Sequence, residues 1–256
     1  LMIALEEQNL VGMRVSDKGQ ALFFDTKTGA ELQRVDLPVP AGTQVSSIST
    51  DQPGSPLVVL GLSNGQALVF HHTYKITYPD NKKTITPGID YPYGKDAFVL
   101  DDQGRSLEHV SVNVNGETLL LAGSTGSHLQ VTQLTREENM MTGEVTSEQN
   151  RIDLPQMTEP VKAIYVDPRQ QWLYVVNGRA TADVFNLRDK SLNGRYKLLE
   201  DGNAEITASG QLVGGISLIF GDSKGGLNQW FMARDPDGES RFKLIRSFQM
   251  ANAPIV

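Results

Sequence analysis

The chain has 256 residues, a formal net charge of −7 and no cysteine. Its length allows one large domain or two small ones with a substantial core. The lack of cysteine excludes a disulfide framework, a thiolate metal site and a cysteine nucleophile. The acidic charge argues against nucleic acid as a partner, because binding to the phosphate backbone needs clustered lysine and arginine.

The sequence contains no segment long and apolar enough to span a membrane. Its most apolar stretches, such as residues 57–62, are far shorter than the roughly 20 residues of a transmembrane helix. The first five residues are apolar, but Glu6 and Glu7 follow at once, so they do not form an intact signal peptide. Since the chain opens on Leu1 and stops at Val256 without a closing signal, we interpret it as a fragment of a longer protein.

One pattern returns along the chain: a strand, a turn centred on glycine, and a second strand that ends in an aromatic or apolar residue. Residues 17–24 and 63–70 are the most similar copies, with turns at Gly19 and Gly65. Weaker copies have turns at Gly126 and Gly225, and a degenerate copy contains Gly178. Glycine adopts the positive φ angles of tight turns, and strands alternate buried and exposed side chains. The pattern therefore predicts a series of β-hairpins.

The spacing of these glycines indicates a β-propeller. Successive turn glycines are 46, 61, 52 and 47 residues apart, and a four-stranded blade takes about 40–50 residues. A further strand is expected before each hairpin, at 45–48, 109–114, 161–166 and 205–208, and Pro254-Ile255 resembles the start of another.

We therefore predict an all-β chain that forms a single β-propeller domain over residues 1–256. About five WD40-like blades are recognisable, and the complete protein can contain more. One or two β-sandwiches are the alternative, but they give no reason for a period near 50 residues.

The longest interval contains an insertion at about residues 78–95. Its three prolines cannot donate hydrogen bonds to a sheet, so we expect a loop. Tyr78, Tyr91 and Tyr93 lie in it, and tyrosine is favoured at protein interfaces. These three residues form a candidate partner-binding loop. The alternative is a loop that packs its own tyrosines over the edge of a blade.

Residue types that carry catalysis are sparse. His71 and His72 are neighbours, so their side chains point to opposite faces of a strand and do not easily ligate one metal. Residues 221–225 have the letters of a nucleophile elbow, but that motif needs a following helix and a strand is expected here. No zinc-ligand spacing is present. We predict no catalytic residue, no cofactor and no metal site, and a binding protein in place of an enzyme.

The C-terminal third resembles a known family. It contains, in order, Gln229-Trp230-Phe231, Arg234-Asp235, Arg246-Ser247-Phe248 and Ala253-Pro254-Ile255. Together these segments are similar to bacterial phosphate ABC transporter permeases. In the large proteobacterial version of that permease, a WD40-like domain is inserted near the N-terminal membrane helix and faces the periplasm.

The resemblance implies that the chain is the periplasmic domain of a protein embedded in the bacterial inner membrane. It implies an accessory role in phosphate import through contacts with transporter subunits or the periplasmic phosphate-binding protein. The transport pathway of the family lies in the permease core, so no transport residue carries over to this chain. Two alternatives remain: a free-standing periplasmic scaffold of the outer-membrane assembly type, and a metal-dependent propeller hydrolase.

Overall fold

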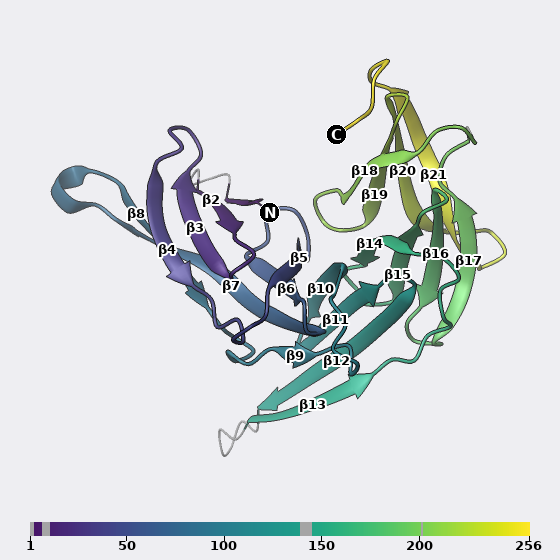
Figure 1. The fold of residues 1–256 in the computed structure, drawn as a ribbon. Helices are drawn as coiled ribbons and strands as arrows, with labels where there is room; N and C mark the ends of the chain where they lie inside the picture. The colour runs from purple at the N-terminus through teal and green to yellow at the C-terminus, as the bar shows by residue number, and fades with distance from the viewer. Residues whose placement is uncertain (1–2, 7–10, 139–144, 201) are drawn as a thin grey trace. The chain divides into compact units, whose positions relative to one another are not determined.

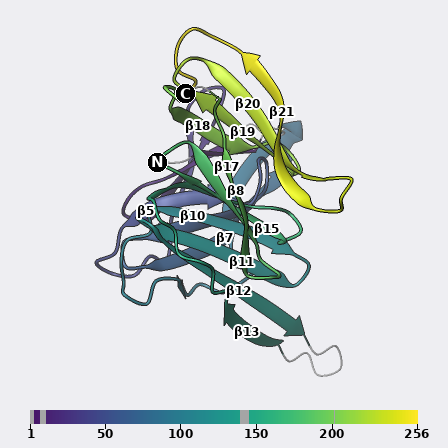
Figure 2. The same cartoon turned by 90° about the vertical axis from the view of Figure 1, so that its right-hand side faces the viewer.

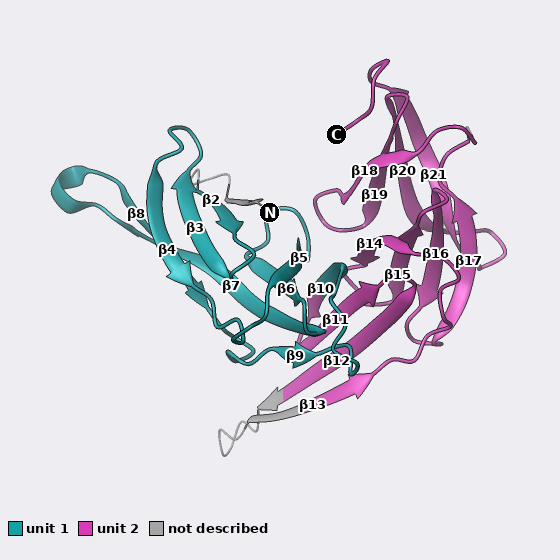
Figure 3. Cartoon of the chain, in the orientation of Figure 1, with its two compact units in different colours: residues 1–112 teal, residues 113–256 magenta. Residues whose placement is uncertain are grey.

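The computed structural model describes residues 3–6, 11–138, 145–200 and 202–256, almost all of them in strands and the turns that join them (Figure 1). The chain divides into two compact units, residues 1–112 and 113–256 (Figure 3). The described strands form five antiparallel sheets, numbered here 1 to 5 in chain order, and in each sheet consecutive strands are neighbours. Among the described residues, no helix is long and apolar enough to cross a bilayer.

The first two sheets lie in unit 1. Sheet 1 contains β1 (Ile3–Glu6), β2 (Val11–Val15), β3 (Gln20–Asp25) and β4 (Glu31–Asp36). Sheet 2 contains β5 (Val45–Thr50), β6 (Leu57–Leu62), β7 (Gln66–Thr77), β8 (Thr84–Asp90) and the short β9 (Phe98–Val99), which also pairs with β7. A single turn of 3₁₀-helix, Pro79–Asn81, lies between β7 and β8.

The other three sheets continue the same order, and the boundary between the units falls inside β10. Sheet 3 contains β10 (His109–Asn115), β11 (Thr118–Thr125), β12 (His128–Glu138) and β13 (Val145–Arg151). Sheet 4 contains β14 (Val161–Val166), β15 (Trp172–Asn177), β16 (Thr181–Asn186) and β17 (Ser191–Lys197). Sheet 5 contains β18 (Ile206–Gln211), β19 (Ser217–Asp222), β20 (Gly226–Arg234) and β21 (Ser240–Gln249), of which the last two pair along their whole length (Figure 2).

The cores form where the faces of consecutive sheets pack together. In unit 1, Phe23 of sheet 1 and Phe70 of sheet 2 belong to one buried cluster. In unit 2, one cluster joins sheets 3 and 4, and another joins sheets 4 and 5 around Phe220. All residues of β6 and β15 are buried, which explains why these second strands read as continuous apolar runs and not as an alternation.

The turn between the second and third strands of each sheet is the repeated element that the sequence predicts. Gly19, Gly65, Gly126 and Gly225 have positive φ angles there, as expected. In sheet 4 the predicted residue, Gly178, is wrong: the positive φ belongs to Ala180, two residues later. The left-handed conformation costs a residue with a Cβ about 1–2 kcal/mol, and sheet 4 tolerates this cost.

A second requirement acts on these turns, because the chain returns to them after the outer strand. The amides of Leu37, Leu100 and Met250 donate to the carbonyl oxygens of Gly19, Gly65 and Gly225, at 2.9–3.0 Å. Leu198 donates to Ala180 in the same way, at 2.9 Å. The returning chain lies so close that a Cβ on Gly225 would be 2.1 Å from the Ala251 carbonyl oxygen. The turn residue therefore has two roles: it reverses the chain between the second and third strands, and its carbonyl oxygen binds the chain that leaves the outer strand of the same sheet.

The prediction of a loop at about 78–95 is wrong in part, because residues 84–90 form strand β8. Pro87 lies in this strand opposite Tyr74 of β7. A proline is tolerated there because β8 is the outermost strand of its sheet, so the missing N–H can face outward. The pair β7–β8 extends as a two-stranded arm beyond the other strands of sheet 2 (Figure 1). The expected single domain over residues 1–256 stays a prediction.

Residues 254–256 form no strand, but Ile255 makes the contacts of a residue that leads into a sheet. Its amide donates to the Asp222 carbonyl at 3.1 Å, and its carbonyl accepts from the Thr207 hydroxyl at 2.6 Å. Leu107, just before β10, makes the equivalent pair of contacts with the Leu62 carbonyl and the Ser46 hydroxyl. The strand start expected at Pro254-Ile255 stays a prediction, because no strand is assigned to these residues.

The close return of the chain predicts unequal effects of alanine at two glycines of sheet 5. Gly214 has φ +89 and open space around its Cβ position, so Gly214→Ala should cost about 1 kcal/mol of unfolding free energy. Gly225→Ala adds a clash with backbone and should cost about 3 kcal/mol or more. Urea unfolding followed by tryptophan fluorescence measures both, because Trp172 and Trp230 lie in unit 2. Equal losses would contradict the role of the return contact.

An ion pair in sheet 2, next to the point where Leu100 returns to the Gly65 turn, predicts that the stability of the fold depends on pH. Buried Asp101 accepts from the Arg105 guanidinium at 2.8 and 3.0 Å, and this bond holds the pKa of Asp101 below its usual value. The ionised carboxylate therefore stabilises the fold above about pH 4, and this contribution is lost as the pH falls through the folded pKa. Asp101→Asn should cost about 2 kcal/mol at pH 7 and less at pH 3.5.

Thermal unfolding followed by circular dichroism measures this difference. Asp96→Asn, at an exposed carboxylate of the same unit, serves as the control. A loss for Asp101→Asn that is the same at both pH values would show that the charge contributes nothing.

Candidate functional site

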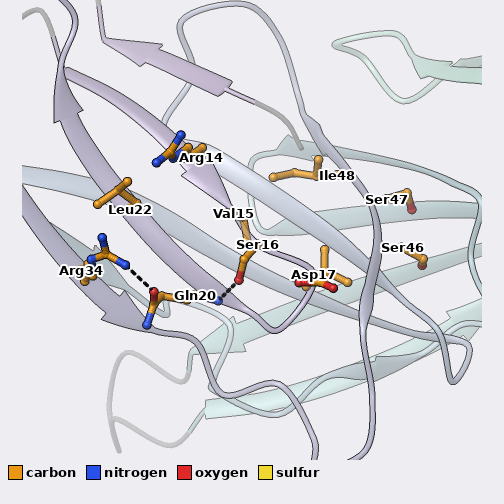
Figure 4. A pocket seen from close by; sticks show the side chains of 11 residues that line it. Arg14, Val15, Ser16, Asp17, Gln20, Leu22, Arg34, Ser46, Ser47 and Ile48 are labelled. Atoms are coloured by element: carbon orange, nitrogen blue, oxygen red, sulfur yellow. Dashed lines mark hydrogen bonds between the residues drawn. The ribbon is translucent and has the colours of Figure 1, made fainter. Parts of the chain in front are cut away.

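A cavity of about 430 Å³ lies between sheet 1 and strand β5 of sheet 2 (Figure 4). Polar side chains from β2, β3, β4 and the β2–β3 turn line one side, and β5 lines the other. The lining residues are Arg14, Val15, Ser16, Asp17, Gln20, Leu22, Arg34, Val45, Ser46, Ser47 and Ile48.

Most polar side chains of this cavity already form hydrogen bonds within the protein. Arg34 binds both carboxylate oxygens of Glu31 at 2.7 Å and donates to the Gln20 side-chain oxygen at 3.0 Å. This bidentate pair lowers the pKa of Glu31. On the other side, the hydroxyls of Ser46 and Ser47 both donate to the Leu107 carbonyl oxygen, at 2.8 and 2.7 Å. These bonds fix the walls of the cavity and leave little for a ligand.

The cavity offers no catalytic arrangement. Its hydroxyl groups have no histidine beside them, and histidine is the usual base for a serine nucleophile. Two cations line the cavity: Arg34 is paired with Glu31, and Arg14 makes no hydrogen bond among the described residues. Over the described part of the chain, no group of three or more histidine, aspartate or glutamate side chains is arranged to hold a metal ion.

The letters of a nucleophile elbow at 221–225 belong to a hairpin turn. The Ser223 hydroxyl accepts from the Glu205 amide at 3.1 Å, and the Ser223 amide donates to the Glu205 carbonyl at 2.9 Å. Strand β20 follows the turn, as the sequence indicates. Ser223 therefore joins β18 to the turn and is not exposed as a nucleophile.

The three tyrosines of the predicted binding loop lie in different environments. Tyr78 is at the tip of the arm and is 64% exposed. Tyr91 packs against the core, with its ring 6.4 Å from that of Phe70 and the Lys95 ammonium 5.6 Å from its centroid. Tyr93 is half-buried in the segment between β8 and β9. Partial burial raises the pKa of Tyr91, which fits a packing residue.

The structure does not bring Tyr78 and Tyr91 together. The arm pairs His71 with Asp90 at its base and Thr77 with Thr84 near its tip. Six residues of strand, at about 3.4 Å each, separate the two ends by about 20 Å. The candidate loop is therefore a pair of separate features, an exposed tip and a packed base.

Two residues that the sequence analysis missed extend the exposed tip into a surface. Tyr74 and Ile76 alternate along β7, so their side chains share one face of the arm, and exposed Tyr78 follows Thr77, the last residue of this strand. Tyr74 and Ile76 are each 37% exposed. This set, Tyr74, Ile76 and Tyr78, is called the arm face below. The period of two was visible in the sequence, but a strand was not expected there.

No family model matches the chain, and no curated protein matches it by sequence. The resemblance of residues 217–256 to phosphate transporter permeases thus stays a prediction. By structure, the chain is similar to the Cps50 (Swd1) β-propeller domain of Myceliophteria thermophila, with a TM-score of 0.57 and 11% sequence identity over 96% of this chain and 70% of that chain. The likeness shows the fold: the chain is a β-propeller whose five sheets are WD40-like blades, as predicted. Such propellers typically serve in protein–protein interaction and are usually non-catalytic.

The different environments of the tyrosines predict different effects on stability. Tyr91→Ala should cost about 2 kcal/mol of unfolding free energy, because it removes a ring that packs on the core of unit 1. Tyr78→Ala should change stability by less than about 0.5 kcal/mol. Thermal unfolding followed by circular dichroism checks both. A large loss for Tyr78→Ala would mean that the tip packs on the domain and is not available to a partner.

Proposed function

We propose that this chain is a non-enzymatic protein-interaction domain that contacts its partner through the arm face. The observation that carries the proposal is the arm itself, which exposes Tyr74 and Ile76 on one face of β7 and Tyr78 at its tip. Tyrosine is enriched among the residues that dominate binding energy at interfaces. The opposite face of the arm carries Thr73, Lys75 and Thr77, so only one face suits a protein surface.

The proposed context is a phosphate ABC transporter permease of the bacterial inner membrane, with this domain on its periplasmic side. The sequence resemblance supports this proposal, and its residues lie in the fifth blade. Trp230 stacks on Phe242 with ring centroids 5.2 Å apart, and Asp235 pairs with Arg241 and Lys243. The resembling residues thus maintain the blade, and the proposed role is accessory: contact with the periplasmic phosphate-binding protein during import.

A cross-linking experiment in cells tests the partner and the location together. In the complete protein, a photo-reactive residue in place of Tyr78 should cross-link to the phosphate-binding protein in phosphate-starved cells. The same residue in place of Lys75, on the opposite face of the arm, should give little of this product. With the purified domain, Ile76→Ser combined with Tyr78→Ala should weaken binding of the phosphate-binding protein at least tenfold.

Lys75→Ala is the matched control for affinity, and it should bind as the unchanged domain does. Cross-links that form only to outer-membrane assembly proteins would support the scaffold alternative instead. Equal affinity of the double variant and the control would remove the arm face from the proposal.

A further inference from the structure

A second cavity, of about 630 Å³, lies in unit 2 between blades 4 and 5. The turns β14–β15, β18–β19 and β20–β21 surround it, together with the adjoining ends of β15 and β20. Its lining residues are Asp167, Pro168, Arg169, Gln171, Trp172, Tyr174, Gly214, Ile216, Met232, Arg234, Gly238 and Ser240. Ligand cavities in proteins commonly measure about 300–1,000 Å³.

The floor of this cavity is aromatic and apolar, with one unused polar group. Trp172, Tyr174 and Met232 contribute side chains, and Tyr174 is only 2% exposed. The Tyr174 hydroxyl makes no hydrogen bond in the described part of the chain. Burial raises the pKa of Tyr174, so the hydroxyl keeps its proton and can donate it to a ligand. The hydroxyl is not fully buried, so it can donate a hydrogen bond to an acceptor bound in the cavity.

Two cations stand at the rim. Arg169 and Arg234 form no ion pair with any described residue. The Nε of Arg234 donates to the Gly238 carbonyl oxygen at 3.1 Å, which orients the guanidinium and leaves its other N–H groups free.

Nearby carboxylates form no ion pair with these arginines in the described part of the chain, and Arg169 interacts electrostatically with one of them, Asp167. Asp167 is buried and accepts the amides of Arg169, Gln171 and Trp172 at 2.6–3.2 Å. Asp235 and Asp237 pair with Arg241 and Lys243. The rim therefore presents unpaired guanidinium groups beside an apolar floor.

We propose that this cavity binds a linear acidic peptide segment of a partner protein, with a carboxylate at Arg234 and Arg169 and an apolar side chain on Trp172 and Met232. This inference rests on the proposed function as a protein-interaction domain and adds a second contact, separate from the arm face. The volume exceeds what a small inorganic anion fills, and such an anion would leave the apolar side chains of the floor uncovered. A peptide that carries both chemical groups uses the whole cavity.

Fluorescence titration of the whole chain tests the proposal, because Trp172 lines the cavity. The probe is the capped peptide acetyl-Glu-Glu-Phe-Glu-Glu-amide, compared with its glutamine counterpart at 150 mM salt. The acidic peptide should change the tryptophan emission with saturation, and the glutamine peptide should bind at least tenfold more weakly. Arg234→Gln should weaken the acidic peptide about tenfold, and Tyr174→Phe severalfold.

Arg246→Gln, at an exposed arginine of β21 outside the cavity, is the control and should leave the affinity unchanged. Equal binding of the two peptides, or an unchanged affinity for Arg234→Gln, would overturn the proposal. Displacement of the peptide by 10 mM inorganic phosphate would also overturn it, in favour of a small-anion site.

The two proposals fail separately. If the phosphate-binding protein still binds through the arm face but no acidic peptide enters the cavity, only the cavity proposal is lost. If the peptide binds and the arm variants have no effect, the cavity proposal stands and the arm face is removed.

Discussion

The fold depends on one repeated hydrogen bond, in which the chain leaving the outer strand of a blade donates an amide to the turn between the second and third strands. The bond from Leu37 to Gly19 has counterparts at Gly65, Ala180 and Gly225. At Gly225 the returning backbone passes so close to the turn that it leaves no room for a side chain. In blade 3, Gly126 accepts instead from Val161, the first residue of the next blade, and space above Gly126 is open. At Gly225 glycine is therefore needed both for its φ angle and for the close return, whereas Ala180 accepts the same bond with its Cβ in place.

This constraint separates the parts of each blade that are fixed from those that vary. The second and third strands and their turn carry the core, since residues such as Leu60 and Phe70 are fully buried. The outer strand, and the turns at the opposite end of each blade from the glycine turn, do not have to fill the core in this way. The arm face lies on the extended β7–β8 hairpin, and the cavity of unit 2 lies among turns and the adjoining ends of β15 and β20. The arm face lies outside the packing between blades, whereas the cavity of unit 2 includes Trp172 and Tyr174 of the core cluster that joins blades 4 and 5.

The turn glycines could be predicted from sequence because a positive φ angle selects glycine strongly, and the spacing then indicated the propeller. Ala180 was missed because a cost of about 1–2 kcal/mol is small enough for a well-packed blade to bear. Pro87 was misleading, since a missing N–H matters only where a neighbouring strand would accept it. The burial of Tyr91 and the cavity around Tyr174 were beyond prediction, because they depend on residues far apart in sequence, such as Asp167 and Ser240.

Among the sheets that the structure describes, the second blade alone has a short fifth strand, β9. In this blade the residue that returns to the turn, Leu100, follows β9 and not β8. The outer strand is thus divided: β9 closes the blade by pairing with Gln66 and Ala67, and β8 belongs to the arm. Residues between Thr77 and Thr84 can change in length or composition without moving the closing bond. Evolution can therefore revise what the arm recognises, or a protein engineer can graft a new recognition loop onto it, while the propeller beneath keeps its register.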